Sequence, residues 1–103
     1  MATLYITEIH DLANANGGKD TQAPIVGSGT TVVEQKVTIG GSSTQSAAFA
    51  PSTHFIMVHS DAICSLAFGT NPTAVATAHR MAANETRFYG VAKGDKLAVI
   101  TNT

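Results

Sequence analysis

The sequence predicts an all-β fold, a small antiparallel β-sandwich of the jelly-roll type. Roughly six short segments are rich in β-branched and aromatic residues, and each is bounded by Gly, Pro or Asn. The length of 103 residues is enough for one domain only. We therefore expect a single sandwich domain over residues 1–103, with a long loop or arm at about residues 10–31.

The first half of the chain predicts one strand before and one strand after a long loop. Residues 2–9 (ATLYITEI) and residues 32–39 (VVEQKVTI) are rich in β-branched residues and alternate in part. The excursion between them is rich in Gly, Asn and Asp and is too long for a tight turn, so we expect an ordered loop or an arm that reaches a neighbour. Pro51 argues against a central strand at residues 46–50, because proline has no N–H to donate.

The second half predicts two hairpins. Residues 54–60 (HFIMVHS) and 62–69 (AICSLAFG) are separated by a gap so short that we expect them to pair around Ser60 and Asp61. The segments TRFYGV and KLAVIT close the sequence around AKGD, where Gly94 can adopt the positive φ that a hairpin loop needs. Between the hairpins, the Val and Thr residues of TAVATAHRMAAN favour an extended segment, and its alanines leave one short helix around residues 73–83 as the alternative.

The composition excludes several classes of partner. Apolar residues make up 44% of the chain and charged residues 13%, about half the usual charged share. Low charge favours a surface that contacts other protein. The six Lys and Arg residues are scattered, so we expect no nucleic acid partner. No apolar run could span a bilayer and no secretion signal is evident, so we expect no membrane partner and synthesis in the cytosol.

The predicted hairpin decides whether the histidines and the single cysteine form a site. Alternation along paired strands puts His59 and Cys64 on one face and His54 on the other, which argues against joint metal binding. Cys64 then reads as a small core residue. No Ser lies in a G-x-S-x-G elbow, so we expect no enzyme, no metal and no cofactor. The residues predicted to form the core are Phe55, Met57, Cys64, Leu66, Phe68, Phe88 and Val99.

The other face of the same hairpin is also apolar, with Ile56, Val58, Ile63 and Ala67. Two apolar faces predict a cover on both sides, by a second layer of the domain or by another chain. The strand edges of ATLYITEI or KLAVIT could then pair between chains. The candidate interface residues are Leu4, Ile6, Ile56, Val58, Ile63 and Tyr89.

Residues 44–100 carry a longer pattern, F-x-x-V-x-x-D-A-x-C-x-x-x-F-G-x-x-P-x-A, then Met-Ala, then G-x-K-x-A-V-I. Its positions are Phe55, Val58, Asp61, Ala62, Cys64, Phe68, Gly69, Pro72, Ala74, Met81, Ala82, Gly94, Lys96, Ala98, Val99 and Ile100. With the opening ATLYITE, this pattern resembles small virion proteins of tailed bacteriophages, of the capsid decoration or cement type.

The resemblance implies a structural role on the outer surface of the phage head. Such a protein binds the major capsid protein, usually as a dimer or trimer of itself, and bridges neighbouring subunits of the shell. It would be made in the cytoplasm of the bacterial host. The alternative is a collar, head-fibre or tail component that binds a receptor or glycan, with Tyr89 and the loops near Asn71 as its contacts.

Overall fold

The computed structural model describes residues 2–9, 12–14, 22–24 and 33–102, and in this part of the chain every regular element is a strand. The ten strands are β1 (Ala2–Ile9), β2 (Leu12–Asn14), β3 (Gln22–Pro24), β4 (Val33–Ile39), β5 (Thr44–Gln45), β6 (Phe55–Ser60), β7 (Cys64–Gly69), β8 (His79–Met81), β9 (Thr86–Gly90) and β10 (Lys96–Thr101). The all-β prediction is therefore confirmed.

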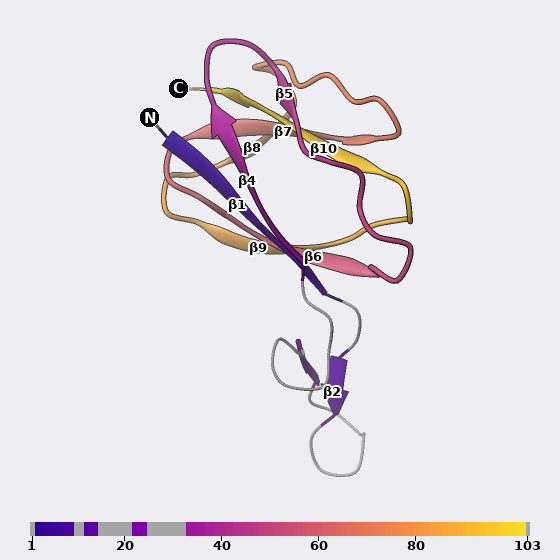
Figure 1. The fold of residues 1–103 in the computed structure, drawn as a ribbon. Coiled ribbons are helices and arrows are strands. Elements are labelled where there is room, and N and C mark those ends of the chain that lie inside the picture. The colour runs from indigo at the N-terminus through magenta and orange to yellow at the C-terminus, as the bar shows by residue number, and fades with distance from the viewer. Residues whose placement is uncertain (1, 10–11, 15–21, 25–32, 103) are drawn as a thin grey trace.

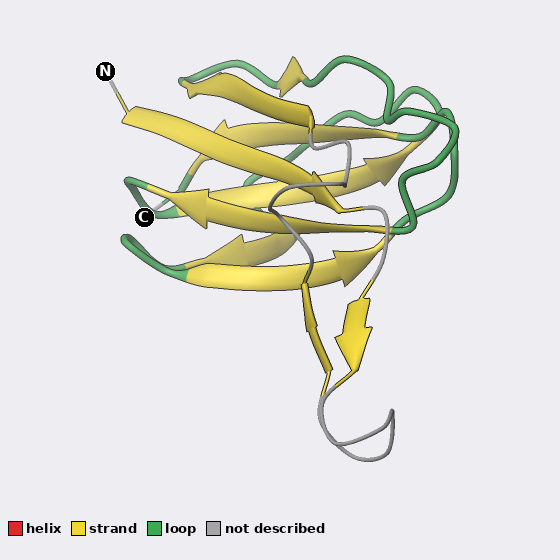
Figure 2. Ribbon diagram, turned by 60° about the horizontal axis from the view of Figure 1, so that its bottom comes forward, coloured by secondary structure: helices red, strands yellow, loops and turns green. Residues whose placement is uncertain are grey.

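Eight of these strands form two four-stranded antiparallel sheets that pack face to face (Figures 1 and 2). The first sheet has the order β4-β1-β6-β9, and the second has the order β5-β10-β7-β8. Neighbours in each sheet come from distant parts of the chain, with β1 paired to β4 and β6, and β10 paired to β5 and β7. Two four-stranded sheets with such crossovers give the double-sheet arrangement of a jelly roll.

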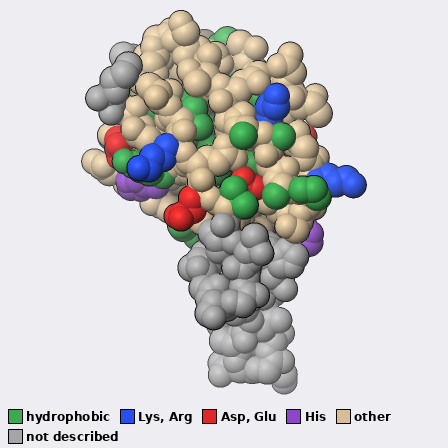
Figure 3. All heavy atoms as spheres, viewed as in Figure 1, with side chains coloured by type: hydrophobic (Ala, Val, Ile, Leu, Met, Phe, Trp, Pro, Cys, Tyr) green, Lys and Arg blue, Asp and Glu red, His purple; other side chains and the backbone are tan. Residues whose placement is uncertain are grey.

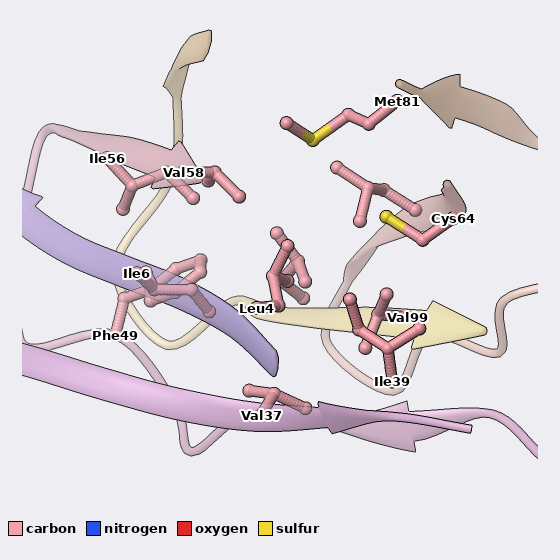
Figure 4. Close-up of a cluster of buried hydrophobic side chains, with 12 residues drawn as sticks. Leu4, Ile6, Val37, Ile39, Phe49, Ile56, Val58, Cys64, Met81 and Val99 are labelled. Carbon is pink, nitrogen blue, oxygen red and sulfur yellow. The ribbon is translucent and has the colours of Figure 1, made fainter. Parts of the chain in front are cut away.

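The core lies between the two sheets (Figure 4). Each strand of the first sheet turns alternate side chains inward, as period-2 geometry requires. Leu4 and Ile6 of β1 and Ile56 and Val58 of β6 are at most 1% exposed. They meet side chains of the second sheet and of the segment that follows β5. That opposing set is Phe49, Cys64, Leu66, Met81, Leu97 and Val99.

The expected hairpin between residues 54–60 and 62–69 is absent. β6 pairs with β1 and β9 in the first sheet, whereas β7 pairs with β10 and β8 in the second. At the end of β6, the Ser60 N–H donates to Glu85 and the Asp61 N–H donates to Thr3, so both residues are still held by the first sheet. The chain then crosses to the other layer. The short gap is therefore a crossover between sheets and not a hairpin loop.

The predicted hairpin of TRFYGV and KLAVIT is also wrong, because β9 belongs to the first sheet and β10 to the second. The expectation for Gly94 is confirmed, since its φ is +80°. Its turn is fastened by the bond from Asp95 N–H to the Ala92 carbonyl and by the bond from Phe49 N–H to the Asp95 carbonyl. A left-handed residue is thus needed where the chain passes between the layers.

The segment 70–78 is a loop that includes a turn in which the Ala78 N–H donates to the Val75 carbonyl, and the short helix considered for residues 73–83 is absent. This segment lies across the outer face of the second sheet. The Gln45 side chain donates to the Pro72 carbonyl at 2.7 Å, and the Asn102 side chain donates to the Ala76 carbonyl at 2.9 Å. Beneath it, Ser65 and Ala98 are fully buried. Ala74 is buried in this segment, and its packing and the bonds to the sheet override the helix propensity of the alanines.

The predicted loop or arm at residues 10–31 lies mainly outside the described residues. Within it, β2 and β3 pair antiparallel with one another, from Leu12 opposite Pro24 to Asn14 opposite Gln22. Neither strand joins a four-stranded sheet. Figures 1 and 2 show this small ribbon outside the two layers.

Candidate functional site

The outer face of the first sheet is the most apolar exposed sheet surface that the described residues form. The register places Tyr5 beside His59, and it places Met57 between Thr7 and Phe88. Tyr5 is 39% exposed and Phe88 is 53% exposed. We call this surface the aromatic face, and its residues are Tyr5, Phe55, Met57, His59 and Phe88.

Few charges border the aromatic face. The ammonium of Lys36 lies 5.7 Å from the centre of the Tyr5 ring, a cation–π distance. His59 Nδ1 lies 2.8 Å from the Thr86 hydroxyl, so its ring is fixed within the sheet. Figure 3 shows, on the side of the molecule seen in Figure 1, Lys, Arg, Asp and Glu side chains scattered among hydrophobic and other atoms. An exposed sheet face that carries large apolar side chains and few charges is typical of a protein-binding surface.

The two sheets differ in how their outer faces are covered. Segment 70–78 crosses the outer face of the second sheet, and Ala74 within it is 2% exposed. On the first sheet, Phe55 and Met57 are only half-buried. Burying large side chains that remain exposed gains roughly 25 cal/mol per Å² of apolar surface. Covering the aromatic face with a partner would therefore bury apolar surface and give a favourable free energy of binding.

A second cluster joins the edge strands β8 and β9 across the two layers. The Tyr89 ring packs against the Phe68 ring, with centroids 5.0 Å apart, and its hydroxyl lies 2.7 Å from His79 Nε2. Arg87 Nη1 lies 3.1 Å from the same nitrogen, and Arg87 Nε donates to Glu85 at 2.8 Å. Arginine can only donate, so His79 Nε2 is the acceptor. Burial raises the pKa of the Tyr89 phenol, so it stays protonated and can donate as well.

The structure divides the predicted core residues into three groups. Cys64, Leu66 and Val99 are buried, as expected. Phe55 and Met57 point outward and are half-buried, because β6 turns Ile56 and Val58 inward instead. Phe68 is 38% exposed and packs against the Tyr89 ring, and Phe88 is 53% exposed. The core predictions for these last four phenylalanine and methionine residues are therefore wrong.

The predicted interface residues are mostly core residues. Leu4, Ile6, Ile56 and Val58 are at most 1% exposed within the single chain, so none of them is available to a partner. Ile63 and Tyr89 are half-buried. The strands proposed for edge pairing, β1 and β10, lie inside their sheets with neighbours on both sides. Four of the six predicted interface residues and both predicted strand edges are therefore occupied within the single chain.

The described titratable residues form no metal-binding group of three or more His, Cys, Asp or Glu. Cys64 is fully buried, and burial raises the pKa of its thiol, which disfavours the reactive thiolate. His54 and His59 lie on a strand end and in mid-sheet, and His10 is outside the described residues. Asn71, expected near a glycan site, accepts a 2.9 Å bond from the Gln45 side chain.

Comparisons with known proteins add no relative to this picture. No family model, no characterised protein and no solved structure matches the chain. Among the described residues, no helix is long and apolar enough to cross a membrane.

Proposed function

We propose that this protein decorates the head of a tailed bacteriophage and stabilises the shell by bridging major capsid protein subunits. The single observation that carries the proposal is the asymmetry of the two outer faces. One face is sealed by segment 70–78, and the other presents Tyr5 and Phe88 at 39% and 53% exposure. The resemblance of residues 44–100 to phage decoration proteins supplies the identity of the partner.

The proposed mechanism is burial of the aromatic face against the shell. Each contact is small, and a symmetric array of many copies multiplies weak contacts into firm attachment. Low charge suits this role, because few ions lose their water when the face is covered. The cation–π pair of Lys36 with Tyr5 gives the face one charged border.

The test is co-sedimentation with phage heads that lack the protein, with the bound copies counted per capsid subunit and the heat resistance of the heads measured. We expect saturable binding at a symmetric ratio and added heat resistance. Tyr5→Ser combined with Met57→Ser should weaken binding. Val75→Ser is the matched control, because Val75 is 51% exposed but lies in the segment over the second sheet. Heads that stay bare would overturn the proposal.

A second candidate is a receptor- or glycan-binding virion component. It is favoured by Phe68, which is 38% exposed and packs beside the Tyr89 ring, whose hydroxyl lies 2.7 Å from His79 Nε2. Exposed rings flanked by polar groups are suited to stacking on sugars. Binding to a glycan array that Phe68→Ser abolishes, without binding to heads, would favour this function.

A further inference from the structure

Among the described strands, β9 has the one long edge that no other described strand or segment covers. The sheets have four outer strands, and two of these are short, with two residues in β5 and three in β8. The third, β4, is flanked by the segment after β5, because the Gln35 side chain bonds both the N–H and the carbonyl of Ala47. An uncovered edge is a template for pairing with another chain unless short length, proline or charge blocks it.

The hydrogen-bond pattern shows which backbone groups this edge offers. Val91 N–H donates to His54 and Ser60 N–H donates to Glu85, and both bonds belong to the ladder between β6 and β9. In an antiparallel ladder, hydrogen-bonded pairs alternate along the strand. Arg87 and Tyr89 therefore bond to β6. Thr86, Phe88 and Gly90 point their N–H and carbonyl groups away from β6, toward the open edge.

We propose that two copies of this chain pair through β9, antiparallel, about a two-fold axis at Phe88. Phe88 then exchanges backbone hydrogen bonds with Phe88 of the second copy, and Thr86 does so with Gly90 of that copy. The first sheets of the two copies join into one continuous sheet. Because Phe88 belongs to the aromatic face, the two aromatic faces become one surface.

Side chains along β9 fit this register. Arg87 lies opposite Tyr89 of the second copy, so a cation meets an aromatic ring. A register shifted by two residues would instead put Arg87 opposite Arg87, and like charges directly opposite are unfavourable. Within each copy, the Arg87 side chain is drawn toward His79 of β8 and does not block the edge. β9 has no proline, and its outward residues Phe88 and Gly90 carry no charge.

The occupant is a second copy because β9 is complementary to itself. The two-fold axis closes the pair, so no further edge is left for a growing filament. A two-fold pair also places both aromatic faces on the same side of the joined sheet, as one shell-facing surface would require. The pairing does not rest on the proposed binding to a shell, since it follows from β9 alone.

Sedimentation velocity over a range of concentrations tests the pairing with the full chain. We expect a monomer–dimer equilibrium in the native protein. Phe88→Pro should abolish the dimer, because proline removes the N–H at the edge and leaves the bonds of Arg87 and Tyr89 to β6 in place. Met57→Ser is the control, since it alters the aromatic face but not the edge, and it should keep the dimer.

Amide hydrogen exchange gives a second readout that needs no variant. Arg87 and Tyr89 amides should be protected at every concentration, and Thr86 and Phe88 amides should become protected only where the dimer forms. A monomer at all concentrations would overturn the proposal. So would a dimer that Met57→Ser abolishes and Phe88→Pro retains, or one whose Phe88 amide exchanges freely. A dimer that leaves phage heads bare would keep this inference and overturn the proposed function.

Discussion

The carboxylate of Glu8 accepts a 2.7 Å hydrogen bond from the hydroxyl of Thr53, a residue 45 positions away in the sequence. The same carboxylate accepts a 2.8 Å bond from the Ala50 N–H and a 2.8 Å bond from the Gln35 side chain. Glu8 is 2% exposed. It therefore fastens β1 to β4 and to the chain that enters β6, and its donors are three neutral groups.

Glu8→Ala should lower the free energy of unfolding by about 3 kcal/mol, because it leaves several donors in a dry site without an acceptor. Urea denaturation measures the change. Glu34→Ala, at an exposed position of β4, is the control and should cost less than about 0.5 kcal/mol. Equal losses in the two variants would contradict the structural role of Glu8.

Leu66→Ala and Phe88→Ala should differ sharply in stability. Leu66 is 1% exposed in the core, so its truncation should cost about 2–5 kcal/mol. Phe88 is 53% exposed, so its truncation should cost less than about 1 kcal/mol. Thermal or urea unfolding of both variants, measured at a concentration where the chain is monomeric, makes the comparison. A large loss of stability for Phe88→Ala alone would mean that β9 is rotated by one residue, so that Phe88 faces the core.

The strand that carries Phe88 shows where the sequence is ambiguous. In TRFYG the alternation is clear, but it does not say which face is inside. Arg87 and Tyr89 lie on the side of β9 that faces the second sheet, where Arg87 reaches His79 and Tyr89 packs against Phe68. In FIMVHS both faces are apolar, so periodicity cannot choose between Met57 and Val58.

Strand pairing is the other feature that local patterns could not supply. The positions of β1, β4, β6, β7, β9 and β10 follow from residue type and turn residues, and the structure contains them all. Their partners are distant in sequence, and the short gaps between β6 and β7 and between β9 and β10 are each compatible with a hairpin or a crossover. Ser60 and Asp61 take part in the crossover because Glu85 and Thr3, far away in the chain, accept their N–H groups. The Glu8 network was missed for the same reason.

Gly94→Ala should lower the free energy of unfolding by about 1 kcal/mol or more. Gly94 has a φ of +80°, a conformation in which a Cβ atom is strained although no atom lies within 4 Å of its place. Gly40→Ala is the matched control, since Gly40 has the same open space and no positive φ. Urea unfolding of the two variants decides the point. A Gly40 variant that is as unstable as the Gly94 variant would contradict the backbone argument.

Glu85 should titrate at lower pH in the folded protein than in the unfolded chain. Its pKa is lowered first by the hydrogen bond from the Ala82 N–H and then by the bond from Arg87. Because the folded pKa is lowered, the stabilising contribution is present above the unfolded pKa and is lost as the pH falls through the folded one. NMR titration of the Glu85 carboxyl, with and without urea, measures both values. Arg87→Gln should raise the folded value only part of the way, since the Ala82 bond remains. A folded pKa equal to the unfolded one would show that neither bond persists in solution. The turn that leads into β9 would then not be held by Glu85.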